Sequence, residues 1–250
     1  MSPPLVITCE HARNAVPARF RRLFVDDPAV LATHRGFDVG ALAVARALSA
    51  AFAAPLFTGR VTRLLVDLNR STHHPGVFSP FSKLLSTTAQ AQLIDEYYAP
   101  FRRDVRGCLD DLLRSAARVI HISVHSHTSE LNGQVRNNAI GVLYDPARRG
   151  EAQFAKSLQR ALAVARPDWH VRRNYPYRGT SDGHVTVLRH VWPAQRYIGI
   201  ELEINQRLLA GPVVQGMSAA VQSAANATQV AKVLAGVVRA VVESDTTVES

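Results

Sequence analysis

Short apolar runs alternate with longer amphipathic segments along most of this 250-residue chain, and this alternation constrains the fold more than any other feature. The short runs are typical of buried strands. Residues 37–52 (FDVGALAVARALSAAF) instead carry apolar side chains at helical spacing. Strands that alternate with helices favour the α/β class. We therefore predict an α/β protein, organised as one domain over residues 1–250.

Seven strands and four helices are expected from these patterns. Pro100 should kink or divide the second helix, and residues 244–250 should form a frayed tail. The two Gly- and Pro-containing segments at 69–86 and 173–190 are long enough to suggest binding loops or lids. The expected strands are 4–9, 54–59, 63–68, 118–124, 139–145, 170–174 and 197–204, and the expected helices are 37–52, 87–114, 148–166 and 215–243.

Composition excludes several classes of protein. No apolar run approaches the roughly 20 residues of a membrane-spanning helix, and the N-terminus lacks the features of a secretory signal, so we expect a cytoplasmic protein without a membrane partner. The net charge is +9, but the arginines are dispersed and no nucleic-acid-binding motif occurs, so no nucleic acid partner is expected. Cys9 and Cys108 are expected to be reduced thiols, with a Cys9–His11 nucleophile pair as an alternative.

Two histidines occur where predicted strands end. His11 follows the strand at 4–9, and His125 follows the strand at 118–124. Active sites of α/β proteins lie beyond the carboxyl ends of strands, and catalytic zinc sites use three ligands drawn from His, Asp and Glu. The third ligand stays open among Asp38, Glu10 and Asn14, because Asp38 could instead cap the helix that follows it.

A second group of polar residues flanks the predicted strand at 63–68. Arg63 begins this strand, and Asn69 and Arg70 follow it. In a functional reading, Asn69 and Arg70 hold a substrate carboxylate, and Arg63 polarises the carbonyl that is attacked. In the alternative reading these are surface arginines, one of them paired with Asp67.

The last predicted strand carries two carboxylates. Alternation along YIGIELEI places Glu201 and Glu203 on one face and the apolar residues on the other. Either this face meets solvent, or one glutamate is a general base that activates water. Glu203 is nearer the carboxyl end of the strand and is the favoured base.

Other residues give weaker signals. The turn NYPYRG is expected to line the pocket, with Tyr177 and Arg178 among its residues. Four further histidines are either supporting groups around the site or solvated loop residues: His73, His74, His127 and His184.

Together these segments resemble the N-formylglutamate amidohydrolase family. The shared pieces occur in order as CEHARNAVP, FDVGA, TRLLVDLNR, HSH, NYPYRG and ELEINQRLL, and they span roughly residues 5–209. The resemblance implies a three-layer α/β/α fold with a mixed, mostly parallel central sheet, like that of phosphorylase/hydrolase-like proteins and zinc exopeptidases.

The resemblance also implies roles for individual residues. His11 and His125 match metal ligands, Glu203 matches the base, and Arg63 matches the arginine that stabilises the oxyanion. The Asn-Arg pair that binds the substrate carboxylate corresponds to residues 69–70. Peptidase relatives carry a ligand glutamate where this chain has Asn14, and formylglutamate hydrolases carry a histidine near Asp38, so Asp38 is the expected third ligand.

The expected function is a zinc-dependent amidohydrolase with one Zn²⁺ per chain. Its substrate is a small anionic N-acyl amino acid such as N-formyl-L-glutamate, bound by Asn69, Arg70, Tyr177 and Arg178, in a monomer or homodimer. Two alternatives are a carboxypeptidase or amidase that acts on a peptide or cell-wall fragment, and a non-catalytic anion-binding module on the same fold.

Overall fold

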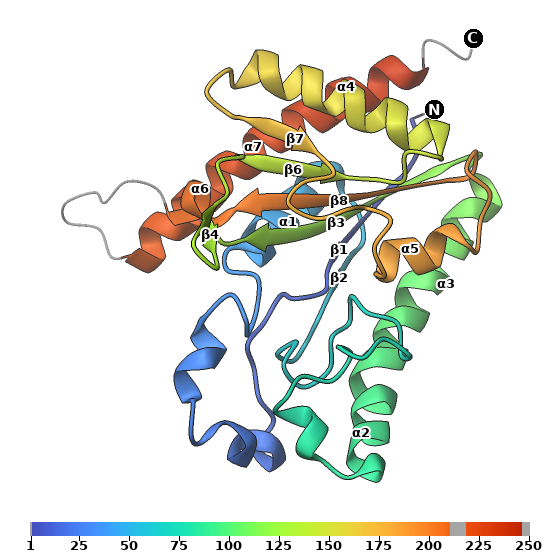
Figure 1. Cartoon of the computed structure of the whole chain (residues 1–250). Coiled ribbons are helices and arrows are strands. Elements are labelled where there is room, and N and C mark those ends of the chain that lie inside the picture. The colour runs from blue at the N-terminus through green and yellow to red at the C-terminus, as the bar shows by residue number, and fades with distance from the viewer. Residues whose placement is uncertain (1, 211–218, 247–250) are drawn as a thin grey trace.

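A six-stranded sheet with helices on both faces forms the centre of the molecule (Figure 1). The computed structural model describes residues 2–210 and 219–246. The strand order is β2-β1-β3-β8-β6-β7, and every neighbouring pair is parallel except β6 and β8. The predicted mixed, mostly parallel α/β/α sheet is therefore confirmed. The strands of this sheet are β1 (Leu5–Cys9), β2 (Leu56–Thr58), β3 (Val119–His127), β6 (Ile140–Leu143), β7 (Val171–Arg173) and β8 (Tyr197–Asn205).

Two apolar clusters lie on opposite faces of the sheet. One cluster packs the sheet against α1 (Ala41–Phe52), α4 (Arg149–Ala165) and α7 (Ala219–Thr246). The other packs it against α3 (Ala99–Ser115) and buried loops. Figure 1 shows α4 and α7 on one side of the sheet and α3 on the other.

The two central strands, β3 and β8, carry different side chains on their two faces, and this difference places the site on one face of the sheet. Successive side chains of a strand point to opposite faces. On the α1/α7 face the side chains of both strands are apolar except for Ser126 near the end of β3. The apolar residues there are Ile120, Ile122 and Val124 of β3, and Ile198, Ile200, Leu202 and Ile204 of β8. On the opposite face, the same strands become polar toward their carboxyl ends. The polar residues on that face are His121, Ser123, His125 and His127 of β3, and Glu201, Glu203 and Asn205 of β8.

The predicted strand at 63–68 is wrong. Residues 61–68 form consecutive turns, with Leu65 N donating to Thr62 O and Asp67 N donating to Val77 O. Their apolar side chains are buried in the cluster beside α3 rather than in the sheet. A short apolar run is compatible with either outcome, because burial alone does not require a partner strand.

The remaining elements agree closely with the predictions. The segment expected as a helix at 87–114 consists of α2 (Thr87–Leu93), a π-helical turn η4 (Ile94–Tyr98) and α3, with Pro100 in the first turn of α3. A proline is tolerated there because the first helical N–H groups have no intrahelical acceptor. Of the expected final helix, residues 215–218 lie outside the described residues, as do residues 247–250 of the expected tail; residues 244–246 are helical.

Several short elements were not expected. The loop at 173–190 contains α5 (His184–Arg189), and β3 continues through His127, so His125 lies within the strand rather than after it. The other short elements are η1 (Ala18–Phe24), η2 (Pro28–Ala32), η3 (Ser82–Leu84), α6 (Gln206–Ala210) and the hairpin of β4 (Glu130–Leu131) and β5 (Gln134–Val135). Within the described part of the chain, no helix is long and apolar enough to cross a membrane.

Candidate active site

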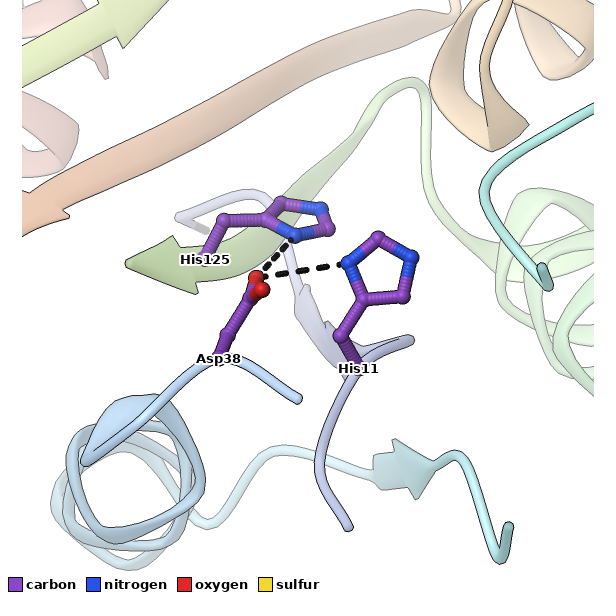
Figure 2. Close-up of side chains that lie close together, drawn as sticks. All are labelled: His11, Asp38 and His125. Atoms are coloured by element: carbon purple, nitrogen blue, oxygen red, sulfur yellow. Dashed lines mark hydrogen bonds and ion pairs between the residues drawn. The ribbon is translucent and has the colours of Figure 1, made fainter. Parts of the chain in front are cut away.

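Two histidines and an aspartate converge at the carboxyl end of the sheet (Figure 2). His11 lies in the turn after β1, Asp38 precedes α1, and His125 lies in β3. Asp38 Oδ2 is 2.8 Å from His125 Nδ1 and 3.3 Å from His11 Nδ1. One ligand atom from each residue lies within 4.8 Å of the others, and all three side chains are buried. This spacing suits a single metal ion.

The opposite nitrogen of each ring is held by another side chain. His11 Nε2 lies 2.7 Å from Asp67 Oδ1, and His125 Nε2 lies 2.9 Å from Ser123 Oγ. An acceptor at one ring nitrogen directs the other toward a metal and sets the tautomer, as in many zinc sites. Two imidazoles and a carboxylate also form a donor set typical of catalytic zinc. The residues present therefore fit the metal that the sequence predicts.

The alternative third ligands lie elsewhere. Glu10 is buried behind His125, where Oε2 accepts a hydrogen bond from Ser123 Oγ at 2.7 Å and Oε1 lies 3.0 Å from His184 Nδ1. Asn14 is exposed. Asp38 does not cap α1, because the N-cap residue is Gly40 and no side chain caps that end. Of the three residues considered, only Asp38 lies between the two histidines.

The charges in this cluster favour ionised groups despite burial. Burial by itself would lower the pKa of His125, but the hydrogen bond and charge of Asp38, with Glu10 and Glu203, raise it to about 10. Burial opposes ionisation of Asp38, yet both histidines hold its pKa below the usual range. Because each ring lies between an acceptor at Nε2 and Asp38 at Nδ1, a cation beside the Nδ1 atoms would take the place of a ring proton.

All nine sequence-predicted site residues line one cavity of about 230 Å³. Histidine and acidic residues of β3, of β8 and of the segments that follow β1 and precede α1 form part of its wall. The loops at 63–70 and 177–182 form another part. The nine residues are His11, Asp38, Arg63, Asn69, Arg70, His125, Tyr177, Arg178 and Glu203.

Arg63 combines both readings of the sequence. Its Nη2 donates to Asp67 Oδ2 at 2.7 Å, and its Nη1 lies 3.6 Å from Asp38 Oδ1. Burial disfavours the charged guanidinium, but these two carboxylates raise the pKa of Arg63. Arg63 is therefore a charged side chain at the cavity wall, fixed in place by Asp67 and adjacent to Asp38.

Asn69 and Arg70 are anchored by the loop that carries α5. The Asn69 side-chain oxygen accepts from His184 N at 2.7 Å, and its amide nitrogen lies 3.3 Å from Glu201 Oε2. Arg70 Nη1 donates to Asp182 O at 2.8 Å. These bonds join two segments more than 100 residues apart in the sequence and fix the orientation of Asn69 in the cavity.

Glu201 and Glu203 are both buried on β8, so the solvent-exposed alternative for this strand face is wrong. The parallel register places Glu203 beside His125 and Glu201 beside Ser123. Burial raises the pKa of Glu201 although His125, Arg189 and Asn69 oppose the rise. Both carboxylates line the cavity.

Close backbone packing forms the wall that carries Tyr177 and Arg178. A Cβ on Gly141 of β6 would lie 2.0 Å from Tyr175 O, and a Cβ on Gly179 would lie 2.2 Å from Tyr144 N. The loop therefore packs directly on β6 and on Tyr144, which follows it, and only glycine permits this approach at these two positions. Arg136 Nη1 also donates to Tyr177 Oη at 3.2 Å.

Two supporting residues, Asp67 and Ser123, were missed as parts of the site. From the sequence alone, Asp67 is expected only as a partner of an arginine. Ser123 could have been found, because strand alternation places it on the same face as His121 and His125.

Comparison with known proteins gives two kinds of match. The sequence model of the N-formylglutamate amidohydrolase family matches residues 3–210. Among solved structures, the chain is similar to a gene product from Agrobacterium tumefaciens, with 26% identity and a TM-score of 0.77 over 95% of this chain and 91% of that one. No curated protein matches the chain.

A second solved structure is the N-formylglutamate amidohydrolase from Ralstonia eutropha JMP134. It has 19% identity and a TM-score of 0.63, over 95% of this chain and 94% of that chain. At this identity the likeness supports the fold alone.

Proposed function

This chain belongs to the N-formylglutamate amidohydrolase family, and we propose that it is a metal-dependent amidohydrolase of small N-acyl amino acids such as N-formyl-L-glutamate. The products are a carboxylic acid and a free amino acid. The observation that carries this proposal is the His11–Asp38–His125 group, which lies in a cavity lined also by Glu203 and Arg63.

The metal in this proposal is one Zn²⁺ per chain, held by His11, Asp38 and His125. A bound Zn²⁺ would activate a water molecule and polarise the amide carbonyl. Asp67 lies at hydrogen-bond distance from His11 Nε2, and Ser123 from His125 Nε2. Both imidazole rings are therefore oriented before a metal binds.

Glu203 acts as the general base. It takes a proton from the attacking water and delivers that proton to the nitrogen of the leaving amine. Arg63 stabilises the negative charge that develops on the carbonyl oxygen. Its guanidinium suits this role because Asp67 and Asp38 keep it charged and oriented although the side chain is largely covered.

Asn69, Arg70, Tyr177 and Arg178 bind the substrate. Arg178 is exposed and has no ion-pair partner among the described residues, so its guanidinium is available for a carboxylate. The cavity of about 230 Å³ is smaller than the range of about 300–1,000 Å³ typical of sites for drug-sized ligands. Its size supports a small N-acyl amino acid rather than a peptide.

The direct test is hydrolysis by the purified, zinc-loaded protein. We expect formate release from N-formyl-L-glutamate, loss of that activity with a chelator, and its return with Zn²⁺. If the protein releases neither formate nor any acid from a panel of N-acyl amino acids, the proposed activity is wrong.

A substitution tests the role of Glu203. Glu203→Gln should lower kcat by at least about 100-fold while metal content stays stoichiometric. The matched control Glu96→Gln changes an exposed carboxylate paired with Arg19 and should leave kcat unchanged. Loss of metal in Glu203→Gln would show that this residue is a ligand rather than a base.

A further inference from the structure

Three buried polar atoms at one side of the cavity have no hydrogen-bond partner among the described residues. They are Nδ1 and Nε2 of His127 and Oε2 of Glu203. The residues are only 3% and 7% exposed, respectively, and both line the cavity. Leaving a buried polar group unpaired is destabilising, so such groups in a folded protein call for a physical explanation.

Strand geometry places these atoms next to each other. His127 is the last residue of β3, two positions after His125 and on the same face of the sheet. Glu203 lies on the adjacent strand, opposite His125 in the register. His127 Nδ1 is 3.5 Å from Glu203 Oε2.

The residue opposite His127 in the register does not compete for this contact. Asn205 donates from its side-chain nitrogen to Arg136 O at 2.8 Å and to Asn138 O at 2.9 Å. Its side-chain oxygen accepts from Arg207 N at 3.1 Å. The amide of Asn205 is therefore already satisfied, and Glu203 Oε2 remains the neighbouring acceptor for His127.

We propose that His127 is the positioning residue of Glu203, donating a hydrogen bond from Nδ1–H to Oε2. This inference rests on the proposed function, in which Glu203 is the base. This hydrogen bond fixes the position of Glu203 Oε2 and leaves Glu203 Oε1 free for proton transfer. Catalytic hydrogen bonds are often long in unliganded sites and tighten when substrate binds, and the 3.5 Å separation needs to shorten by about 0.3–0.8 Å to reach hydrogen-bond length.

Kinetics of two variants separate this role from simple space filling. His127→Leu keeps bulk but has no donor, whereas His127→Asn places an amide N–H near the position of Nδ1. We expect His127→Leu to lower kcat about 10- to 100-fold, as small misplacements of reacting groups do, with KM nearly unchanged. His127→Asn should recover most of kcat. His170→Leu, a change of an exposed histidine outside the cavity, is the control.

Two kinetic outcomes would overturn the proposal. A raised KM with unchanged kcat would mean that His127 contacts the substrate rather than Glu203. Equal losses of kcat in the Leu and Asn variants would mean that the imidazole matters for its shape and not for its hydrogen bond. Metal content of each variant is measured to exclude loss of the ion.

A spectroscopic test needs no turnover. In the zinc-loaded protein with ¹⁵N-labelled histidine, the His127 ring signals are identified by their disappearance in His127→Asn. We expect a protonated Nδ1 whose chemical shift changes in Glu203→Gln. An unprotonated Nδ1, or a shift insensitive to Glu203→Gln, would refute the bond. If the wild-type protein hydrolyses no N-acyl amino acid, the proposed function fails, and this measurement still decides whether the bond exists.

Discussion

Asp67→Asn is the substitution that most directly tests how the metal site is supported. Asp67 is buried and lies 2.7 Å from His11 Nε2, and it accepts hydrogen bonds from Arg63 Nη2 at 2.7 Å and from Asn69 N at 2.9 Å. It is not part of the His11–Asp38–His125 group itself. Any effect on metal binding must therefore pass through His11 or through the local charge.

The expected magnitude follows from these three bonds. An asparagine at this position can keep an oxygen toward His11 and Asn69, but its NH₂ group then faces the Arg63 guanidinium, which is also a donor. The variant loses one charge-assisted bond and the negative charge that favours a metal-binding His11. Removing a partner of this kind typically lowers metal affinity about 10- to 100-fold, which corresponds to about 1.4–2.7 kcal/mol.

The assay is a competition titration of Zn²⁺ between the protein and a chromophoric chelator at neutral pH. Thermal unfolding of each variant establishes that it is folded under the same conditions. Asp104→Asn serves as the control, because it also removes one carboxylate but from the exposed surface of α3. Equal zinc affinities of Asp67→Asn and wild type would refute the reasoning, as would an equal loss in Asp104→Asn.

Two further predictions concern substrate binding and acid stability. Arg178→Ala should raise KM for N-formyl-L-glutamate more than it lowers kcat, and steady-state kinetics that show the reverse would place Arg178 in the chemical step. Burial and the charge of His184 lower the pKa of His121 to about 3, so the unfolded chain binds a proton that the folded chain excludes below pH 6.5. Stability should therefore fall as pH drops from 6.5 toward 3, by about 2 kcal/mol between pH 7 and pH 5 for this one group. Urea unfolding in chelator should show a smaller loss in His121→Gln, and the same pH dependence in both proteins would contradict the assignment.

The fold was predictable where burial and periodicity agree. Residues 118–124 and 197–204 are apolar on at least one face and long enough to span the sheet, and both are strands. Residues 63–68 have the same local character, yet they form turns beside α3. What differs is the position along the chain, because the run follows β2, which is one of the two edge strands of the sheet. The local sequence does not show whether another strand will pair with β2 at that edge.

The site was predictable in a similarly uneven way. Strand ends and strand alternation identified His125 and Glu203, because period-two geometry follows from the sequence. Asp67 was not identified as a partner of His11, since the two residues are 56 positions apart and meet only through the turns at 61–68. The hydrogen bond between Asn69 and the backbone of His184 likewise depends on α5, which was not expected. Partners set by irregular backbone leave little trace in local sequence.

The polar face of β3 and β8 explains why the chain can keep so many ionisable groups inside its core. Burying a charge is costly unless it is paired and hydrogen-bonded. Glu10 meets this condition fully, because Thr8, Ser123 and His184 all lie within hydrogen-bond distance of its carboxylate. Pairing is less complete elsewhere in this network. His184 Nε2 has no hydrogen-bond partner among the described residues, and at the cavity wall the same holds for both ring nitrogens of His127 and for Glu203 Oε2. His127 and Glu203 line the cavity, so their unpaired atoms can bond to a molecule that enters it, whereas His184 is not part of the cavity lining. The three unpaired atoms at the cavity wall favour a catalytic role for this end of the polar face, because a purely structural network would gain stability from pairing them.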